Sequence, residues 1–152
     1  MRRSLSNPED VSELKRRLNQ LNEHSPRKWG RMSSAQMVGH CDKILQVGLT
    51  KIVLPETNLV FKTVGICTKL TMKVCNHGIP PNMPTFQVVK LKENCNFEST
   101  KADFLATFEE FLSSLHADTL LRRHALFGEM TSCDWAFLQY KHINHHLKQF
   151  GV

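Results

Sequence analysis

The sequence contains no apolar run that approaches the ~20 residues needed to cross a bilayer, so no membrane span is expected. No apolar stretch follows Met1, Arg2 and Arg3, so no secretory signal is expected either. Glycine-rich phosphate loops, G-x-S-x-G elbows and paired-carboxylate motifs are missing, which argues against the enzyme classes built on them. With 7 Gly and 6 Pro among 152 residues, the composition suggests neither a fibrous repeat nor disorder.

Cysteine is present, but its spacing matches no zinc or redox motif. The count is odd and no C-x-x-C pair occurs, which favours free thiols in a reducing cytoplasm. Cys41 directly follows His40 and could approach a site there, although a small core residue is the commoner role. Cys133 leaves the same two alternatives open. The five are Cys41, Cys67, Cys75, Cys95 and Cys133.

The positive charge is spread along the chain rather than concentrated. The formal net charge is +6, but no dense basic stripe with interleaved aromatics occurs, so a nucleic-acid partner is not expected. Lys15, Arg16 and Arg17 are expected on a solvated helix face. A length of 152 residues with 41% hydrophobic residues suits one domain over residues 1–152. The oligomeric state stays open, a homodimer included.

Hydrophobic periodicity and capping residues predict an all-α protein. Helices are expected to begin near Asn7-Pro8, at Ser33 and near Thr131, because each of these positions carries a capping pattern. Two more helices are expected over about residues 58–74 and 99–115. Residues 77–84 are expected to form a loop, and residues 85–91 a short extended piece. Four or five helices with short-to-medium connections favour a helical bundle with a short irregular or extended insertion.

The last predicted helix carries His142 and His146 on or beside its apolar arc. Residues four apart are neighbours on a helix, so an H-x-x-x-H pair can point two imidazoles at one ion. His40 lies on the apolar stripe of the helix that begins after Ser33 and could supply a third ligand. His145 falls at the edge of the solvent sector, and Gln149, one turn from His146, could orient a ligand or substrate.

A lone histidine on an apolar face is more often a hydrogen-bonded core residue than a ligand. The H-x-x-x-H spacing alone is also a weak signal. The combination of His40, His142 and His146 nevertheless predicts a site for one divalent ion, with zinc, nickel, iron or copper suited to imidazole ligands. The chain's other unassigned histidines, His24, His77 and His116, are expected at the surface.

Several segments resemble one branch of the DinB/YfiT-like superfamily. Near the C-terminus these are the segments 124–131 (H-A-L-F-G-E-M-T) and 141–151 (K-H-I-N-H-H-L-K-Q-F-G), with Trp135 between them. Trp29-Gly-Arg-Met and residues 35–41 (A-Q-M-V-G-H-C) are similar to its N-terminal pattern, and Asn82-Met-Pro-Thr85 to its central P-T loop. The chain departs from the pattern at Ala125, where the branch has Pro, and at Asn144, where it has Asp.

This resemblance implies a four-helix bundle of DinB/YfiT-like type with a metal bound by His40, His142 and His146. It also implies a metal-dependent enzyme acting on a small-molecule substrate, either a thiol-dependent S-transferase with a low-molecular-weight thiol as cosubstrate, or a hydrolase. The alternative is a non-catalytic metal-binding or stress-response module. Asn144 is expected to point away from the ligands, so that metal binding survives that departure.

Overall fold

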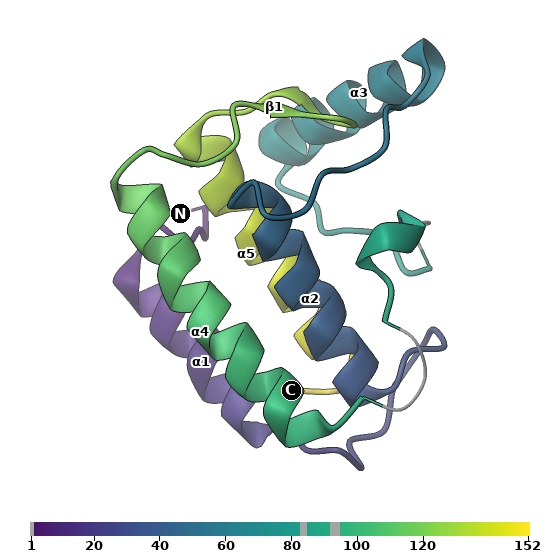
Figure 1. Ribbon diagram of the computed structural model, residues 1–152, viewed down its shortest axis with the longest axis vertical. Helices are drawn as coiled ribbons and strands as arrows, with labels where there is room; N and C mark the ends of the chain where they lie inside the picture. Colours follow the sequence, from purple (N-terminus) through teal and green to yellow (C-terminus); the bar gives the residue numbers. More distant parts are fainter. Residues whose placement is uncertain (1, 83–84, 92–94) are drawn as a thin grey trace.

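The protein is mostly helical, as the sequence predicts. The computed structural model describes residues 2–82, 85–91 and 95–152 (Figure 1). Within this part of the chain lie five α-helices, one 3-10 turn and one two-stranded ladder. In chain order they are α1 (Pro8–Gln20), α2 (Ser34–Gly48), α3 (Leu59–Cys75), η1 (Gln87–Val89), α4 (Phe97–His116), β1 (Arg123–His124), β2 (Gly128–Glu129) and α5 (Ser132–Gln149).

The three predicted helix starts are confirmed, and each follows from a local hydrogen bond. The side chain of Asn7 accepts from the backbone N–H of Glu9, ahead of Pro8 at the first position of α1. Ser33 with Gln36, and Thr131 with Asp134, form reciprocal capping boxes at the starts of α2 and α5. These caps satisfy backbone donors that the first turn of a helix leaves without partners.

Helices α1, α2, α4 and α5 pack against one another around a common core (Figure 1). The closest pairing joins α2 to α4, and Gly48 permits it because a Cβ there would lie 2.6 Å from Cε2 of Phe111. Burying the aromatic side chains of α4 supplies several kcal/mol of apolar transfer energy, at about 25 cal/mol per Å². The most completely buried of these are Phe104, Phe108 and Phe111.

Arg17 corrects one expectation. The solvated-face prediction for residues 15–17 is wrong at this position, where the residue is only 8% exposed. Its guanidinium donates to Asn144 Oδ1 at 2.7 Å, to the carbonyl of Val152 at 2.8 Å and to Glu13 at 3.0 Å. A fixed fork of donors suits this task, which ties α1 to the C-terminal end of the chain.

Helix α3 covers the predicted range but lies apart from the other helices (Figure 1). It contacts the β1–β2 hairpin, where the missing Cβ of Gly65 makes room for the carbonyl of Leu126. Of its large apolar side chains only Met72 is buried, whereas Phe61, Val64 and Leu70 are more than half exposed.

The extended piece expected over residues 85–91 is wrong at Gln87–Val89, which form the 3-10 turn η1, whereas the flanking Phe86 and Lys90 have extended backbone angles. Its Val89 is completely buried and its carbonyl lies 3.0 Å from Nδ1 of His40. The loop expected at 77–84 is confirmed over residues 77–82. The central residues of the proposed P-T loop, 83–84, lie outside the described residues.

The hairpin was not predicted, because each strand has only two residues and carries no alternating pattern. Arg123 pairs with Glu129 and His124 with Gly128, and Gly128 has a φ of +66° that favours glycine. Among the described residues, no helix combines the length and apolar character that a bilayer crossing requires. Cys41, Cys67, Cys75 and Cys133 form no disulfide.

Candidate metal centre

Two neighbouring helices bring three histidines together. His40 lies in the second turn of α2 and is 3% exposed, so its predicted inward position is confirmed. His142 and His146 follow one turn apart on α5, and His146 is 7% exposed. Because residues four apart share one face of a helix, His142 and His146 meet the neighbouring helix together.

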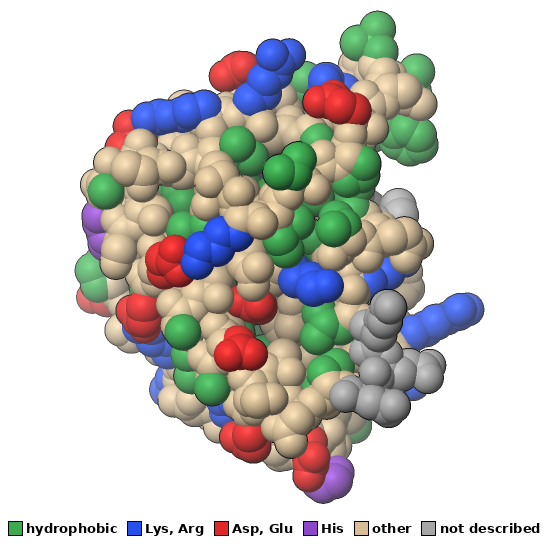
Figure 2. All heavy atoms as spheres, in the orientation of Figure 1, with side chains coloured by type: hydrophobic (Ala, Val, Ile, Leu, Met, Phe, Trp, Pro, Cys, Tyr) green, Lys and Arg blue, Asp and Glu red, His purple; other side chains and the backbone are tan. Residues whose placement is uncertain are grey.

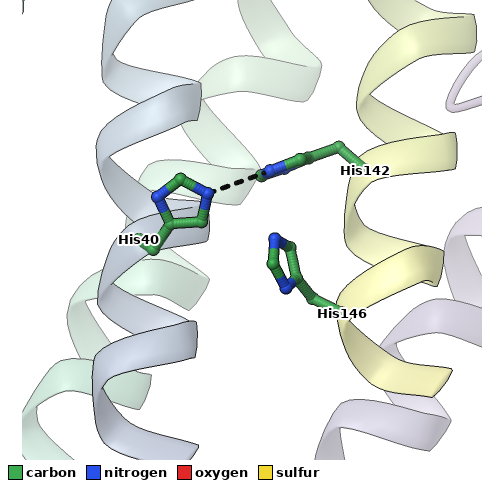
Figure 3. A group of neighbouring side chains, drawn as sticks. All are labelled: His40, His142 and His146. Atoms are coloured by element: carbon green, nitrogen blue, oxygen red, sulfur yellow. Dashed lines mark hydrogen bonds between the residues drawn. The ribbon is translucent and has the colours of Figure 1, made fainter. Parts of the chain in front are cut away.

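The three imidazoles point toward one another across the interface between α2 and α5 (Figure 3). The Nε2 atoms of His40 and His142 are 3.2 Å apart, and one ring nitrogen from each of the three residues lies within 4.8 Å of the others. Two nitrogens each about 2.0–2.1 Å from a tetrahedral zinc are roughly 3.3–3.4 Å apart. The group therefore could hold one metal ion.

Hydrogen bonds on the outer side of the rings select the nitrogen that faces the centre. Nδ1 of His40 lies 3.0 Å from the carbonyl oxygen of Val89, which only accepts, so Nδ1 carries the hydrogen. Nδ1 of His146 lies 2.8 Å from Oε1 of Gln149. The amide of Gln149 is oriented in turn, because its Nε2 donates to the carbonyl of Trp29 at 2.8 Å. Both imidazoles thus present a free Nε2 lone pair to the centre, as in oriented metal ligands.

His142 differs from the other two histidines. Its Nδ1 is a buried nitrogen without a hydrogen-bond partner among the described residues. Its Nε2 faces the Nε2 lone pair of His40, so either it donates to that lone pair or both nitrogens accept a shared cation. The donor set, three imidazoles with two of them held in the required tautomer, fits a divalent ion that prefers nitrogen ligands.

Burial keeps these histidines neutral near pH 7. Desolvation lowers the pKa of His40, against the raising effect of its hydrogen bond to Val89. Desolvation, followed by repulsion from the neighbouring imidazoles, holds the pKa of His142 well below the ordinary value. The pKa of His146 falls to about 3, mainly by burial and next by the repulsion that a protonated His40 would exert. Neutral imidazole is the form that binds a metal, so the ligands need little deprotonation.

The neighbouring residues lie largely where the sequence predicted. His145 is partly exposed beside Trp29, with its ring centroid 5.7 Å from the indole, and does not join the group. Asn144 points away from the ligands, toward Arg17. Cys41 contacts Sδ of Met37 in the core, and burial raises the pKa of its thiol, which supports the packing role. The surface positions predicted for His24, His77 and His116 are confirmed.

Sequence reasoning missed the backbone acceptors of the site. The carbonyls of Val89 and Trp29 orient two of the three histidines, yet a carbonyl carries no side-chain signature. Gly30 is the one detectable trace, because a Cβ at this glycine would lie 2.5 Å from Nε2 of Gln149, and its φ is +79°. The sequence pattern also does not predict the position of His124. It is buried in the hairpin and belongs to a separate cavity of about 180 Å³ at the C-terminal end of α2.

A family model described as "Protein of unknown function (DUF1569)" matches residues 1–151. No curated protein and no solved structure matches the chain.

Proposed function

The chain belongs to the DUF1569 family of proteins of unknown function, and we propose that it is a divalent-metal-dependent enzyme with His40, His142 and His146 as ligands. The observation that supports this proposal is the convergence of three ring nitrogens, two of them with the tautomer already fixed by outer hydrogen bonds. Ordinary core histidines need one partner each, and a mutual approach of three such nitrogens is costly without a shared ligand.

The ligand number supports catalysis over a closed structural site. The group contains no fourth His, Cys, Asp or Glu among the described residues, and three protein ligands are typical of catalytic zinc sites. Because all three ligands are neutral, they leave the charge of a dication uncompensated. A bound ion would supply acidity, lowering the pKa of a coordinated water or thiol toward neutrality.

Two substrate classes fit such a site, a thiol donor for S-transfer and an ester or amide for hydrolysis. We favour S-transfer with a low-molecular-weight thiol, on the resemblance to the DinB/YfiT-like superfamily described above. The packing of α1, α2, α4 and α5, with the ligands on α2 and α5, supports assigning the fold to the four-helix bundle of that superfamily.

The burial of the site favours a second candidate. His40 and His146 are nearly inaccessible to solvent and His142 is half-buried, which suits a non-catalytic metal-binding or stress-response module as well as an enzyme. The two candidates differ in whether a small molecule reaches the ion, so they are separated by turnover and not by metal content.

The first experiment measures metal content in protein purified without chelators or an affinity tag. Elemental analysis should find one divalent ion per chain in the wild type and in His145→Ala. His142→Ala should lose it, and matched circular dichroism spectra should show that the helices persist. A wild-type protein that binds no ion after incubation with zinc, nickel or iron would refute the proposal.

The second experiment tests the chemistry with metal-loaded protein. Glutathione, bacillithiol or mycothiol is supplied with a chlorodinitrobenzene-type or epoxide electrophile, and ester hydrolysis is assayed in parallel. The rate should exceed the uncatalysed one, stay in His145→Ala and fall to background in His142→Ala. Full metal occupancy without turnover of either class would favour the non-catalytic module.

A further inference from the structure

The outward face of α3 forms an apolar stripe with a regular spacing. Its members are separated by four, three, four and three residues, the pattern of a helix that packs along another helix over two heptads. Val60, Val64 and Val74 are 70%, 58% and 77% exposed, and the intervening Cys67 and Thr71 are exposed as well. Figure 2 shows hydrophobic side chains gathered where the N-terminal end of α3 projects from the molecule.

The charges of α3 all lie away from this stripe. The helix contains no acidic residue, and its three lysines are engaged by the rest of the chain. Lys62 pairs with Glu56, Lys69 donates to the carbonyl of Glu129 and Lys73 pairs with Asp134. A second copy of the stripe would therefore meet no like charge, which is the usual obstacle to pairing identical surfaces.

The polar side chains of α3 are also satisfied without water. The hydroxyls of Thr63, Thr68 and Thr71 donate to backbone carbonyls of the same helix, at 2.9, 2.8 and 3.0 Å. Each threonine thus presents a methyl group without needing a partner for its hydroxyl. The face can be dehydrated at little cost.

The exposed apolar area of α3 suits an interface at the small end of the range for dimers. Six large apolar side chains of α3 are more than half exposed, and burial worth 1.5–3 kcal/mol each at 25 cal/mol per Å² corresponds to about 60–120 Å² per side chain. The sum, roughly 400–700 Å², is the most that α3 can contribute, because Leu59, Phe61 and Leu70 flank the stripe rather than lie on it, and it stays below the ~800 Å² per partner of a standard interface. These side chains are Leu59, Val60, Phe61, Val64, Leu70 and Val74.

We propose that α3 is the interface of a homodimer, packing along α3 of a second copy around a two-fold axis near Cys67. The pairing is isologous, so one uncharged self-complementary patch serves both chains. Cys67 is the central member of the stripe, and the central residue faces its own counterpart whether the helices run parallel or antiparallel. This inference is independent of the metal centre.

Light scattering on the eluting protein tests the interface. The wild type should have twice the 17.5 kDa mass of the chain at concentrations of tens of micromolar. The variant Val60→Glu/Val64→Glu should elute as a monomer with an unchanged helical spectrum, because both side chains are solvent-exposed. Val53→Glu is the matched control, since Val53 is 84% exposed but lies outside α3, and it should stay dimeric.

Crosslinking tests the position of the axis. In a Cys75→Ser/Cys133→Ser background, a short bismaleimide should join Cys67 to its counterpart and give a covalent dimer. The control variant Cys67→Ser/Cys75→Ser, which retains Cys133, should give no covalent dimer. A monomeric wild type, a dimer that survives both glutamates, or a monomer that instead sediments through this face with phosphatidylglycerol vesicles would each overturn the proposal.

Discussion

Buried His124 should make the stability of the protein sensitive to mild acid. Its Nδ1 accepts from the backbone N–H groups of Leu126 at 3.0 Å and Phe127 at 3.3 Å, and its ring stacks on Phe127 with centroids 4.8 Å apart. Protonation would convert this acceptor into a donor and break both hydrogen bonds. Burial, and then the charge of Lys69, lowers the pKa of His124 to about 4.

The sign and the size follow from linkage. In the unfolded chain the pKa is near 6.5, so the unfolded state binds a proton that the folded state excludes. The stability contributed by neutral His124 is complete above pH 6.5 and is lost as the pH falls from 6.5 to about 4. A shift from 6.5 to about 4 corresponds to roughly 3 kcal/mol, at about 1.4 kcal/mol per pKa unit.

The substitution His124→Asn isolates this contribution, because the Asn oxygen can accept the same two hydrogen bonds but does not titrate. The variant should be about 1–2 kcal/mol less stable at pH 7.5, through lost ring packing. Its stability should then fall less steeply below pH 6.5, so that the deficit shrinks or reverses by pH 4.5. Urea unfolding followed by circular dichroism, with chelator present throughout, measures both curves.

His116→Asn is the matched control for the chemical change, since His116 is exposed on α4. Parallel stability curves for the wild type and His124→Asn between pH 7.5 and 4.5 would refute the reasoning. The hydrogen bonds to His124 would then persist in acid, or the residue would be accessible to water.

Three further predictions concern the metal centre and the C-terminal anchor. Metal at about 100 times its dissociation constant should stabilise the fold by about 2.7 kcal/mol and raise the melting temperature by roughly 5–10 °C. His146→Ala should abolish this gain, whereas His145→Ala should keep it. Equal losses in the two variants would contradict the ligand assignment. Gln149→Ala should weaken metal affinity about 10–100-fold in competition titrations while one ion still binds at saturation, and an unchanged affinity would exclude the orienting role. Asn144→Asp should raise the free energy of unfolding by about 1 kcal/mol at pH 7, because the new carboxylate pairs with Arg17. In urea melts this gain should disappear below about pH 4, where the carboxylate is protonated. A variant that is less stable than the wild type at pH 7 would contradict this prediction.

Features that depend on residues close together in the sequence could be predicted from it. The starts of α1, α2 and α5 follow from capping side chains two or three residues away, and His40, His142 and His146 were selected by helical spacing alone. The ladder of four residues and the turn η1 were missed, because their conformations depend on contacts with distant segments.

Arg17 and α3 show the limit of helix patterning. A charged residue on a polar stripe looks solvated until the C-terminus folds over it, and two of the three acceptors of Arg17, Asn144 and Val152, lie more than 100 residues away in the sequence. Conversely, the apolar composition of α3 predicts burial that a single chain does not provide. In both cases the sequence identified the helix but not the surface that the helix meets.

The unequal outer hydrogen bonds of the three ligands have a consequence for how such a site is lost over generations. Replacing His40 leaves the carbonyl of Val89 without its hydrogen bond, and replacing His146 does the same to the amide of Gln149. Each loss lowers the free energy of unfolding by about 1–3 kcal/mol, in addition to the lost packing. Replacing His142 leaves no described group outside the three ligands without a hydrogen bond, because its Nδ1 has no partner among the described residues. In descendants released from selection for the metal, we expect drift to begin at position 142, and an intact His40 beside a substituted 142 would be its trace.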